Sequence, residues 1–381
     1  MKIMHLVEST APYGANKSLI DLVDYVRERG VTPFVVGSDN GPLAEWLESR
    51  GIFYRALGHK LSIYPKSDSL FKKLLFPSKV LAIRLLNLIA LIRLLLICRK
   101  LSPDIIHTNI GPCTIGYWAA RILGIKHVWH LREYQDLDFD LRIFPSKSRF
   151  IRLLAKSDFV ICITEAIARH FSNPGKFRVI SDGVATRDDH YFDPEKADYF
   201  LFAGRLEPTK GIGQAISGYL AYCAKYDISH KLLIAGDGHP EYVEQLKAQV
   251  ALTQFGENVQ FLGFRNDTLS LMRKAKALIV ASRCEGFGRI TPEAMFNGCM
   301  VIGRNTGGTA EILNSNDQER IGLLFDDEKS LVQCMKEAAA LSADNYQSLV
   351  LRAQAKAIDK YGIERHGREI YGIYQGMHRT Q

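Results

Sequence analysis

The chain of 381 residues is long for one compact domain and suits two α/β domains of about 180 residues each. Hydrophobic residues make up 47% of it and charged residues 24%, which excludes a disordered chain and a disulfide scaffold. The net charge of +8 favours anionic partners. Zinc-finger spacing, aromatic RNA-binding motifs and runs of five basic residues are all missing, so we expect no nucleic-acid partner.

Cysteine usage and the first residues bear on the cellular compartment. The seven cysteines are odd in number, scattered and never spaced as C-x-x-C, which is typical of reduced thiols. The first ten residues, MKIMHLVEST, contain an apolar stretch much shorter than that of a signal peptide. We therefore expect a cytoplasmic protein.

Short apolar runs alternate with amphipathic stretches in the first half of the chain. This pattern is expected of buried parallel strands connected by crossover helices. We predict strands at residues 3–7, 33–36, 53–57, 104–107, 127–130, 159–163 and 178–180. They define one parallel sheet in an amino-terminal Rossmann-like domain over residues 1–181.

Residues 79–100 form the most hydrophobic segment of the chain. Arg84, Asn87 and Arg93 interrupt it, and central arginines are costly in hydrocarbon, which favours a crossover helix buried on one side over a membrane span. A further interpretation stays open, in which residues 72–100 form a basic amphipathic surface that rests on an anionic membrane. Its cations are Lys72, Lys73, Lys79, Arg84, Arg93, Arg99 and Lys100.

The alternation of strands and helices restarts after a polar segment, residues 182–197, which we predict to be a linker. Strands are expected at residues 199–203, 232–235, 259–262, 278–280, 301–303 and 322–325, and helices at 212–226, 241–252 and 330–340. They define a second Rossmann-like domain over residues 198–360. Two such domains that face each other would hold a substrate in the cleft between them.

Two carboxylates bracket a glycine turn in the stretch SRCEGFGRITPEAMFNG, which follows an apolar strand. Pro292 suits the first turn of a helix over residues 291–297, and Gly298 suits its end. Glu285 then lies in the loop at the end of the strand, and Glu293 lies in the first turn of the helix. Backbone N–H groups of residues 286–289 are expected to line the same crevice.

This stretch resembles the signature of glycosyltransferase family four, in which two glutamates separated by seven residues precede a second glycine turn. Glu285 and Glu293 have that spacing, and VIGRNTGGTAEIL fits the turn. The resemblance implies the GT-B fold, with two Rossmann-like domains and a last helix, about residues 363–381, that packs back on the first. It also implies that Glu293 holds the donor ribose and that Glu285, with the amides after it, meets the donor sugar.

The loop AGRLEPTKG follows the first strand of the second half and carries Arg205 and Lys210. A guanidinium binds phosphate oxygens in pairs and an ammonium acts as a point charge, so together they suit a pyrophosphate. Both match charged positions of the family. Because these cations would replace a divalent ion at the leaving diphosphate and no metal-binding cluster appears, we expect no metal and no cofactor.

The acceptor half resembles the family less closely. The loop APYGANKS resembles the family's glycine loop, from which we carry over Gly14, and it leaves Lys17 as a candidate contact to the acceptor. The family commonly places a histidine beside the donor sugar. His130 ends a predicted strand and suits that role, although His107 and His127 compete for it.

We therefore expect a retaining glycosyltransferase of EC class 2.4 that transfers a hexosyl or N-acetylhexosaminyl group. The donor is a nucleotide-diphosphate sugar, UDP-linked first and GDP-linked next, and the acceptor is a saccharide, lipid-linked if residues 72–100 bind membrane. The alternatives are an inactive nucleotide-sugar-binding subunit and an NAD-dependent dehydrogenase, which the lack of G-x-G-x-x-G disfavours. The candidate catalytic residues are His130, Arg205, Lys210 and Glu285, and the candidate donor-binding residues are Gly14, Gly204, Arg205, Lys210, Glu285, Gly286, Phe287, Gly288, Arg289 and Glu293.

Overall fold

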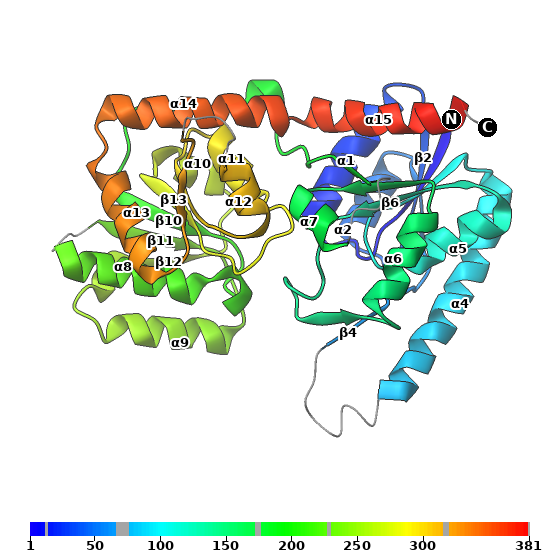
Figure 1. Cartoon of the computed structure of the whole chain (residues 1–381), viewed down its shortest axis with the longest axis horizontal. Coiled ribbons are helices and arrows are strands. Elements are labelled where there is room, and N and C mark those ends of the chain that lie inside the picture. The colour runs from blue at the N-terminus through cyan, green and yellow to red at the C-terminus, as the bar shows by residue number, and fades with distance from the viewer. Residues whose placement is uncertain (12–13, 66–75, 172–176, 227–229, 315–319, 380–381) are drawn as a thin grey trace. The chain divides into compact units, whose positions relative to one another are not determined.

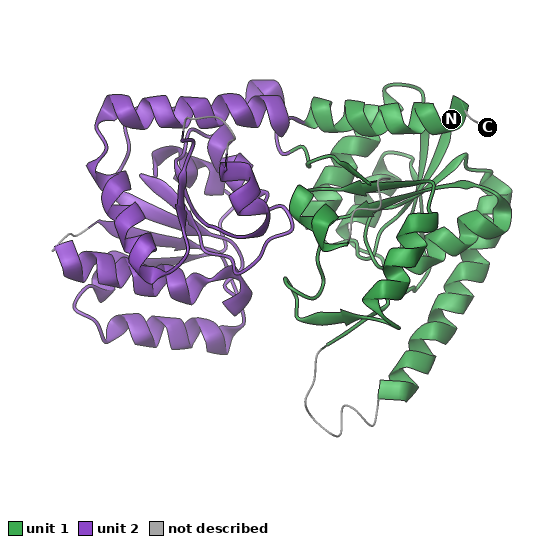
Figure 2. Ribbon diagram, in the orientation of Figure 1, with its two compact units in different colours: residues 1–183, 363–381 green, residues 184–362 purple. Residues whose placement is uncertain are grey.

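A computed structural model of the chain describes all residues except 12–13, 66–75, 172–176, 227–229, 315–319 and 380–381. The chain forms two compact units (Figure 2): unit 1 contains residues 1–183 and 363–381, and unit 2 contains residues 184–362. Most of the segment that we predicted to be a linker, residues 184–197, lies in unit 2. Lys72 and Lys73 lie outside the described residues.

Unit 1 is built on a seven-stranded sheet in the order β3-β2-β1-β5-β6-β8-β9, in which every pair of neighbours is parallel. Each of these strands coincides with a predicted one, because burial on both faces produces the continuous apolar runs seen in the sequence. The strands are β1 (Lys2–Leu6), β2 (Thr32–Gly37), β3 (Phe53–Ala56), β5 (Ile105–Thr108), β6 (Lys126–Leu131), β8 (Phe159–Cys162) and β9 (Phe177–Val179).

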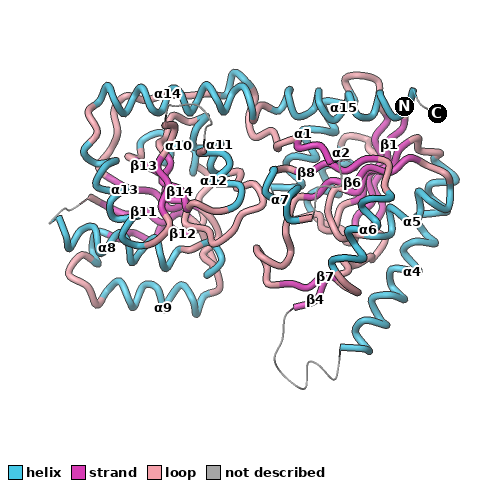
Figure 3. The backbone as a smooth tube through the Cα atoms, viewed as in Figure 1, coloured by secondary structure: helices cyan, strands magenta, loops and turns pink. Residues whose placement is uncertain are grey.

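Helices cover this sheet (Figures 1 and 3). The last helix, α15, belongs to unit 1 because Ile370, Ile373 and Tyr374 are buried against Ile3 of β1 and Leu22 of α1. The helices are α1 (Gly14–Arg27), α2 (Pro42–Ser49), α4 (Phe76–Leu101), α5 (Thr114–Leu123), α6 (Lys147–Lys156), α7 (Glu165–His170) and α15 (Ile363–Arg379).

A small antiparallel pair in unit 1 was not predicted. β4 (Ile63–Pro65) pairs with β7 (Leu141–Ile143), so that Tyr64 lies opposite Arg142. The two strands have three residues each and lie far apart in the chain, so neither produces a periodic pattern that the sequence alone would reveal.

Unit 2 is built on a six-stranded parallel sheet in the order β12-β11-β10-β13-β14-β15. All six strands were predicted. They are β10 (Tyr199–Ala203), β11 (Lys231–Ala235), β12 (Val259–Gly263), β13 (Ala277–Val280), β14 (Val301–Arg304) and β15 (Leu323–Phe325). The helices are α8 (Ile212–Tyr226), α9 (Pro240–Ala251), α10 (Thr268–Lys274), α11 (Ile290–Phe296), α12 (Gly307–Leu313), α13 (Glu328–Ala340) and α14 (Ala343–Lys360).

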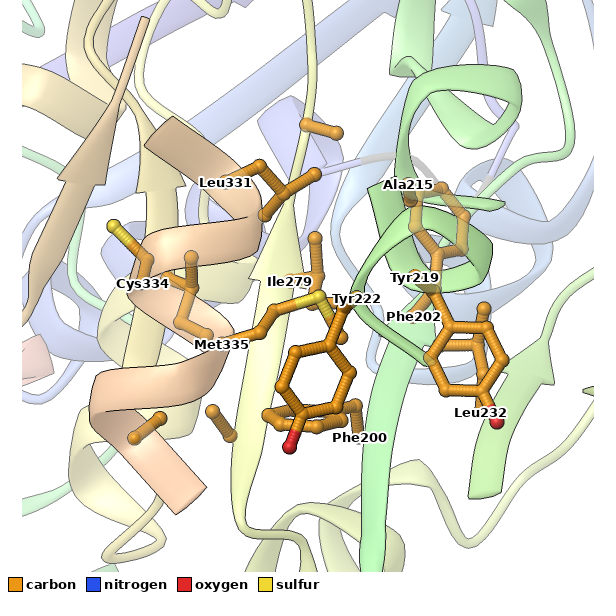
Figure 4. Close-up of a cluster of buried hydrophobic side chains, with 14 of the residues drawn as sticks. Phe200, Phe202, Ala215, Tyr219, Tyr222, Leu232, Ile279, Leu331, Cys334 and Met335 are labelled. Carbon is orange, nitrogen blue, oxygen red and sulfur yellow. The ribbon is translucent and has the colours of Figure 1, made fainter. Parts of the chain in front are cut away.

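The core of unit 2 packs large side chains of the sheet against α8 and α13 (Figure 4). Phe200 of β10 and Tyr219 of α8 are fully buried, as are Leu331 and Met335 of α13. The two helices come close at Gly218, where an added Cβ would overlap the Leu331 side chain. This close approach packs α8 directly against α13 beside the sheet.

Candidate active site

The candidate donor residues of unit 2 lie where the strand order of its sheet reverses. β10 and β13 are neighbours in the sheet, but β10 is followed by β11 on one side and β13 by β14 on the other. The loops after β10 and β13 therefore diverge and leave a crevice at the carboxyl ends of the strands, the usual ligand site of such sheets. Arg205 and Lys210 lie in the first loop and Glu285 lies in the second.

The loop after β10 is fixed against the end of β13. Gly211 has φ +72, and a Cβ there would run into the carbonyl of Ala281, so only glycine allows the loop to lie this close. The backbone N–H of Arg283 donates to the carbonyl of Thr209 at 2.9 Å. These contacts set the direction of Lys210, whose Nζ donates to Glu285 Oε1 at 2.7 Å.

Glu285 is held by both loops. Its Oε1 accepts the bond from Lys210 and a second one from Ser282 Oγ at 2.7 Å, and its side chain is only 15% exposed. Its carbonyl accepts a bond from the backbone N–H of Gly308 at 2.8 Å. A Cβ at Gly307 or Gly308 would overlap the backbone of residues 285–287, which explains why the sequence has two glycines there.

The remaining predicted donor residues surround this pair. Arg205 Nη1 lies 2.9 Å from Glu207 Oε1, and the Arg205 side chain is half exposed. Glu293 lies in the first turn of α11, with its Oε1 3.5 Å from Arg289 Nε. Gly288 has φ +79 and allows the turn between Glu285 and α11.

Three further predicted donor residues present no accessible side chain to a ligand. The ring of Phe287 is buried, with its centroid 5.6 Å from that of Tyr361, so this side chain packs within unit 2. Gly204 has φ +149, and a Cβ on the neighbouring Gly236 would overlap the Gly204 carbonyl. Gly286 follows Glu285 in the same loop. Only main-chain atoms of Gly204 and Gly286 are available to a ligand.

The pair of loops combines two chemistries within a few ångströms. Two cations from one loop can bind the oxygens of a diphosphate, and the Glu285 carboxylate can accept hydrogen bonds from sugar hydroxyls. The hydrogen bond between Lys210 and Glu285 holds both side chains in place. In the part of the chain that the structure describes, no group of three or more His, Cys, Asp or Glu side chains could hold a metal ion.

The glycine loop of unit 1 is described only in part, since residues 12–13 lie outside the described ranges. Gly14 is the first residue of α1, and Lys17 is exposed on that helix. The buried residue here is Asn16, whose Nδ2 donates to the carbonyls of Ser9 at 2.7 Å and Ala11 at 2.6 Å. Asn16 therefore holds Ser9 and Ala11 of this loop in place. Sequence reasoning did not identify this role of Asn16.

The three candidate histidines all lie inside unit 1. His107, His127 and His130 are buried, and burial is the main reason that the pKa of each is lowered, that of His127 to about 3. His130 stacks on His107 with ring centroids 5.4 Å apart, and Arg132 lowers its pKa further. The neutral His130 ring is thus enclosed by unit 1 rather than exposed at its surface.

A buried ion pair beside His130 was missed by sequence reasoning. Arg132 Nη1 lies 2.5 Å from Asp182 Oδ1, and both side chains are less than 5% exposed. Ser18 Oγ donates to Asp182 Oδ1 at 2.9 Å and lies 3.2 Å from His366 Nε2, which ties α1 and α15 to the pair. The available signal was that residues 132 and 182 each follow the end of a predicted parallel strand.

Two further carboxylates lie at the same edge of the unit 1 sheet, after β1 and β6. Burial, the largest cause, and the neighbouring Asp138 raise the pKa of Glu133 to about 7. Burial and Asp39 raise the pKa of Glu8. A carboxyl group with a pKa of about 7, such as Glu133, can donate a hydrogen bond as well as accept one, which suits contact with hydroxyl groups.

The chain has two Rossmann-like units, and unit 2 has a cationic loop and a carboxylate loop where the strand order of its sheet reverses. Together these features define the GT-B class of folds. Anabaena HepE, solved in complex with UDP, has this fold, with a TM-score of 0.78 at 20% identity over 99% of this chain and 100% of that one. Residues 12–188 match the family described as Glycosyltransferase Family 4, and residues 186–357 match Glycosyl transferases group 1. The two models describe the two halves of one family, and the chain belongs to this family, the group 1 glycosyltransferases of family 4.

Two curated relatives illustrate its range. An uncharacterized glycosyltransferase of Methanocaldococcus jannaschii is 28% identical over 55% of this chain and 58% of its own length. The UDP-Gal:α-D-GlcNAc-diphosphoundecaprenol α-1,3-galactosyltransferase of Escherichia coli is 26% identical over 90% of this chain and 88% of its own length. The chain thus spans little more than half of the first relative and most of the second.

Proposed function

We propose that this protein transfers a sugar from a nucleotide-diphosphate sugar to a hydroxyl group of a lipid-linked saccharide, with retention of anomeric configuration. A UDP-sugar is the favoured donor, and a GDP-sugar is the second candidate. The observation that carries the proposal is the contact between Lys210 and Glu285 at the strand-order reversal of unit 2, with Arg205 in the same loop. This arrangement provides positive charge for a diphosphate next to a carboxylate for a sugar, as a nucleotide sugar requires.

The names of similar proteins support the proposed donor and acceptor. The Escherichia coli relative is named for UDP-galactose and for an acceptor linked to diphosphoundecaprenol. A Campylobacter jejuni relative, 28% identical over 45% of this chain, is also named for a diphospho-undecaprenol acceptor. HepE was solved with UDP and with UDP-glucose.

In the proposed reaction the bond between the anomeric carbon and the diphosphate breaks first. Arg205 and Lys210 stabilise the negative charge that develops on the leaving diphosphate, in place of a metal ion. The acceptor hydroxyl attacks the same face of the oxocarbenium-like centre, and its proton passes to a leaving phosphate oxygen. Glu285 orients the donor sugar and Glu293 the ribose, so the protein acts by positioning and needs no carboxylate nucleophile.

Lys210→Ala tests this assignment. Loss of a preorganised charge at the leaving group is expected to lower the transfer rate about 10²- to 10³-fold. The matched control is Lys247→Ala, which removes an exposed lysine of α9 in the same unit and should leave the rate unchanged. A Lys210→Ala rate equal to that of the control would refute the role of the loop.

The same assay separates the enzyme from the alternative, an inactive donor-binding subunit. A thermal-shift panel of UDP- and GDP-sugars first identifies the donor, since a ligand at 100 times its Kd stabilises by about 2.7 kcal/mol. Donor binding without hydrolysis or transfer by the wild-type protein would support the inactive subunit. NMR of the product would test retention through the anomeric configuration of the new bond.

We also propose that the protein acts at the cytoplasmic face of an anionic membrane, through α4. Among the described residues, α4 is the one helix that could cross a membrane by length and composition. Its most apolar 18-residue window has a mean hydropathy of 2.4 and is only 17% buried. Ala90, Leu94 and Cys98 anchor one side in the core of unit 1, so the helix lies on the unit rather than apart from it. The exposed apolar side chains of the other side are Leu81, Leu85, Leu86, Leu88, Ile89, Ile92 and Leu96.

Charge and hydrophobicity act together on this surface. α4 carries Lys79, Arg84, Arg93, Arg99 and Lys100 and contains no acidic residue. Vesicles of phosphatidylglycerol should therefore bind the protein in flotation assays at low salt, and less at high salt, where the charges are screened. No flotation at low salt would contradict the membrane proposal.

A further inference from the structure

A pocket of about 600 Å³ lies in unit 1 between α4, α5, α6 and the β4–β7 pair, apart from the candidate active-site residues. Its apolar wall includes Leu88 and Leu91 of α4, Ile115 and Trp118 of α5, and Leu153 of α6. Arg84, Arg149, Arg152 and Lys156 also line it. Among the described residues that line the pocket, none is acidic.

The α4 side of the pocket is preformed. Asn87 accepts a bond from the backbone N–H of Lys60 at 2.8 Å and donates to the Lys60 carbonyl at 2.9 Å, which fixes the rotation of the helix. Arg84 lies over the ring of Phe144 with its guanidinium carbon 5.0 Å from the ring centroid. The Phe144 ring in turn packs edge-on against Tyr64 at 5.4 Å. These ring contacts hold the Arg84 guanidinium at the pocket.

The position of the pocket relates it to the acceptor edge of unit 1. Pro112, which lines it, lies in the connection that follows the carboxyl end of β5, and Thr114, which also lines it, is the first residue of α5. Ligands of open α/β sheets bind at this edge, and β1 and β6 flank β5 there. Leu88 and Trp118 are each about half exposed, so the pocket also borders the outer apolar face of α4.

We propose that this pocket binds the polyprenyl diphosphate part of the acceptor. The isoprenoid chain would lie along the apolar wall and continue over the exposed leucines of α4, and the phosphates would contact Arg84, Arg149, Arg152 and Lys156. A diphosphate diester carries one negative charge on each phosphate, which matches several cations better than the single phosphate of a common phospholipid does. The inference rests on the proposed function and assigns its acceptor to specific residues.

The test uses the full-length protein and a sugar-diphospho-polyprenol of short chain length in neutral detergent, with binding measured by isothermal titration. Arg149→Gln/Arg152→Gln removes two charges from the pocket. Arg55→Gln/Arg379→Gln removes the same charge from exposed side chains of unit 1 that lie outside both the pocket lining and α4. We expect the pocket variant to lose at least about 10-fold in affinity and the control at most about 2-fold.

Kinetics keep this inference separate from the proposed function. The pocket variant should raise KM for the lipid-linked acceptor while the Kd for the nucleotide sugar stays unchanged. Equal affinity in the pocket variant and the control, or equally tight binding of phosphatidylglycerol, would overturn the inference and leave the donor chemistry intact. Absence of turnover in the wild-type protein would instead count against the proposed function, and the binding measurement would still decide on the pocket.

Discussion

Removal of Asp182 should destabilise unit 1 far more than removal of an exposed aspartate. Asp182 accepts hydrogen bonds from Arg132 and Ser18, and both members of the ion pair are almost completely buried. Asp182→Ala would leave the Arg132 guanidinium buried beside neutral histidines. Breaking a buried pair in this way costs about 3–5 kcal/mol.

The expected shift in melting temperature follows from the size of the unit. Unit 1 has roughly 200 residues, and unfolding at about 2.1 cal/mol/K per residue gives an entropy near 0.4 kcal/mol/K. A loss of 3–5 kcal/mol then lowers the melting temperature by about 7–12 °C. Tryptophan fluorescence reports on this unit selectively, because all three tryptophans, Trp46, Trp118 and Trp129, lie in it.

Two comparisons make the measurement decisive. Asp24→Asn removes the partner of Arg50 in a surface ion pair of the same unit and should cost no more than about 1 kcal/mol. Arg132→Met/Asp182→Leu removes both charges, and its loss in free energy of unfolding should be smaller than the sum of the losses in the two single variants. The reasoning is refuted if Asp182→Ala melts within about 2 °C of Asp24→Asn, because a buried unpaired guanidinium must destabilise the unit by more than such a shift represents.

Three further outcomes test the donor loops and the titrating edge of unit 1. Gly308→Ala should raise the donor Kd at least about 10-fold, because its Cβ would push the Phe287 backbone and displace Glu285, and a normal Kd would show that the loop adapts. Gly372→Ala, with nothing within 4 Å of the added Cβ in α15, should leave the Kd unchanged and stabilise unit 1 by up to about 1 kcal/mol in the same fluorescence melts. The pKa of Glu133 is raised to about 7, so folding favours its protonated form. The stability of wild type relative to Glu133→Gln should therefore fall by at most about 3 kcal/mol as pH rises from about 4.5 to 7. A stability difference in urea unfolding that does not depend on pH would contradict the raised pKa.

Local pattern was enough to predict most of the architecture. Strands of both parallel sheets produce continuous apolar runs because they are buried on two faces, and α8 was predicted at its observed bounds. The loops that carry Arg205, Lys210 and Glu285 could be found because each directly follows such a strand. Carboxyl ends of neighbouring parallel strands meet at one edge, so position in the chain implied proximity in space.

Contacts between distant segments could not be predicted in this way. Arg132 and Asp182 are 50 residues apart, and only the β6-β8-β9 order of the sheet brings their strands to one region. The orientation of Phe287 toward Tyr361 depends on the packing of α14, which no local pattern of the glycine turn contains. Likewise, α4 reads as an apolar helix in the sequence, but its neighbours in the fold decide which of its leucines are covered.

The sequence by itself therefore determined the two α/β units and the charged loops of the donor site, because hydrophobic period and strand-end position are local properties. Tertiary structure alone decided that His107, His127 and His130 are enclosed in unit 1, and that α4, α5 and α6 surround an apolar pocket with cations at its wall. Burial and cavity shape depend on which surfaces meet, and side chains far apart in the chain make those surfaces.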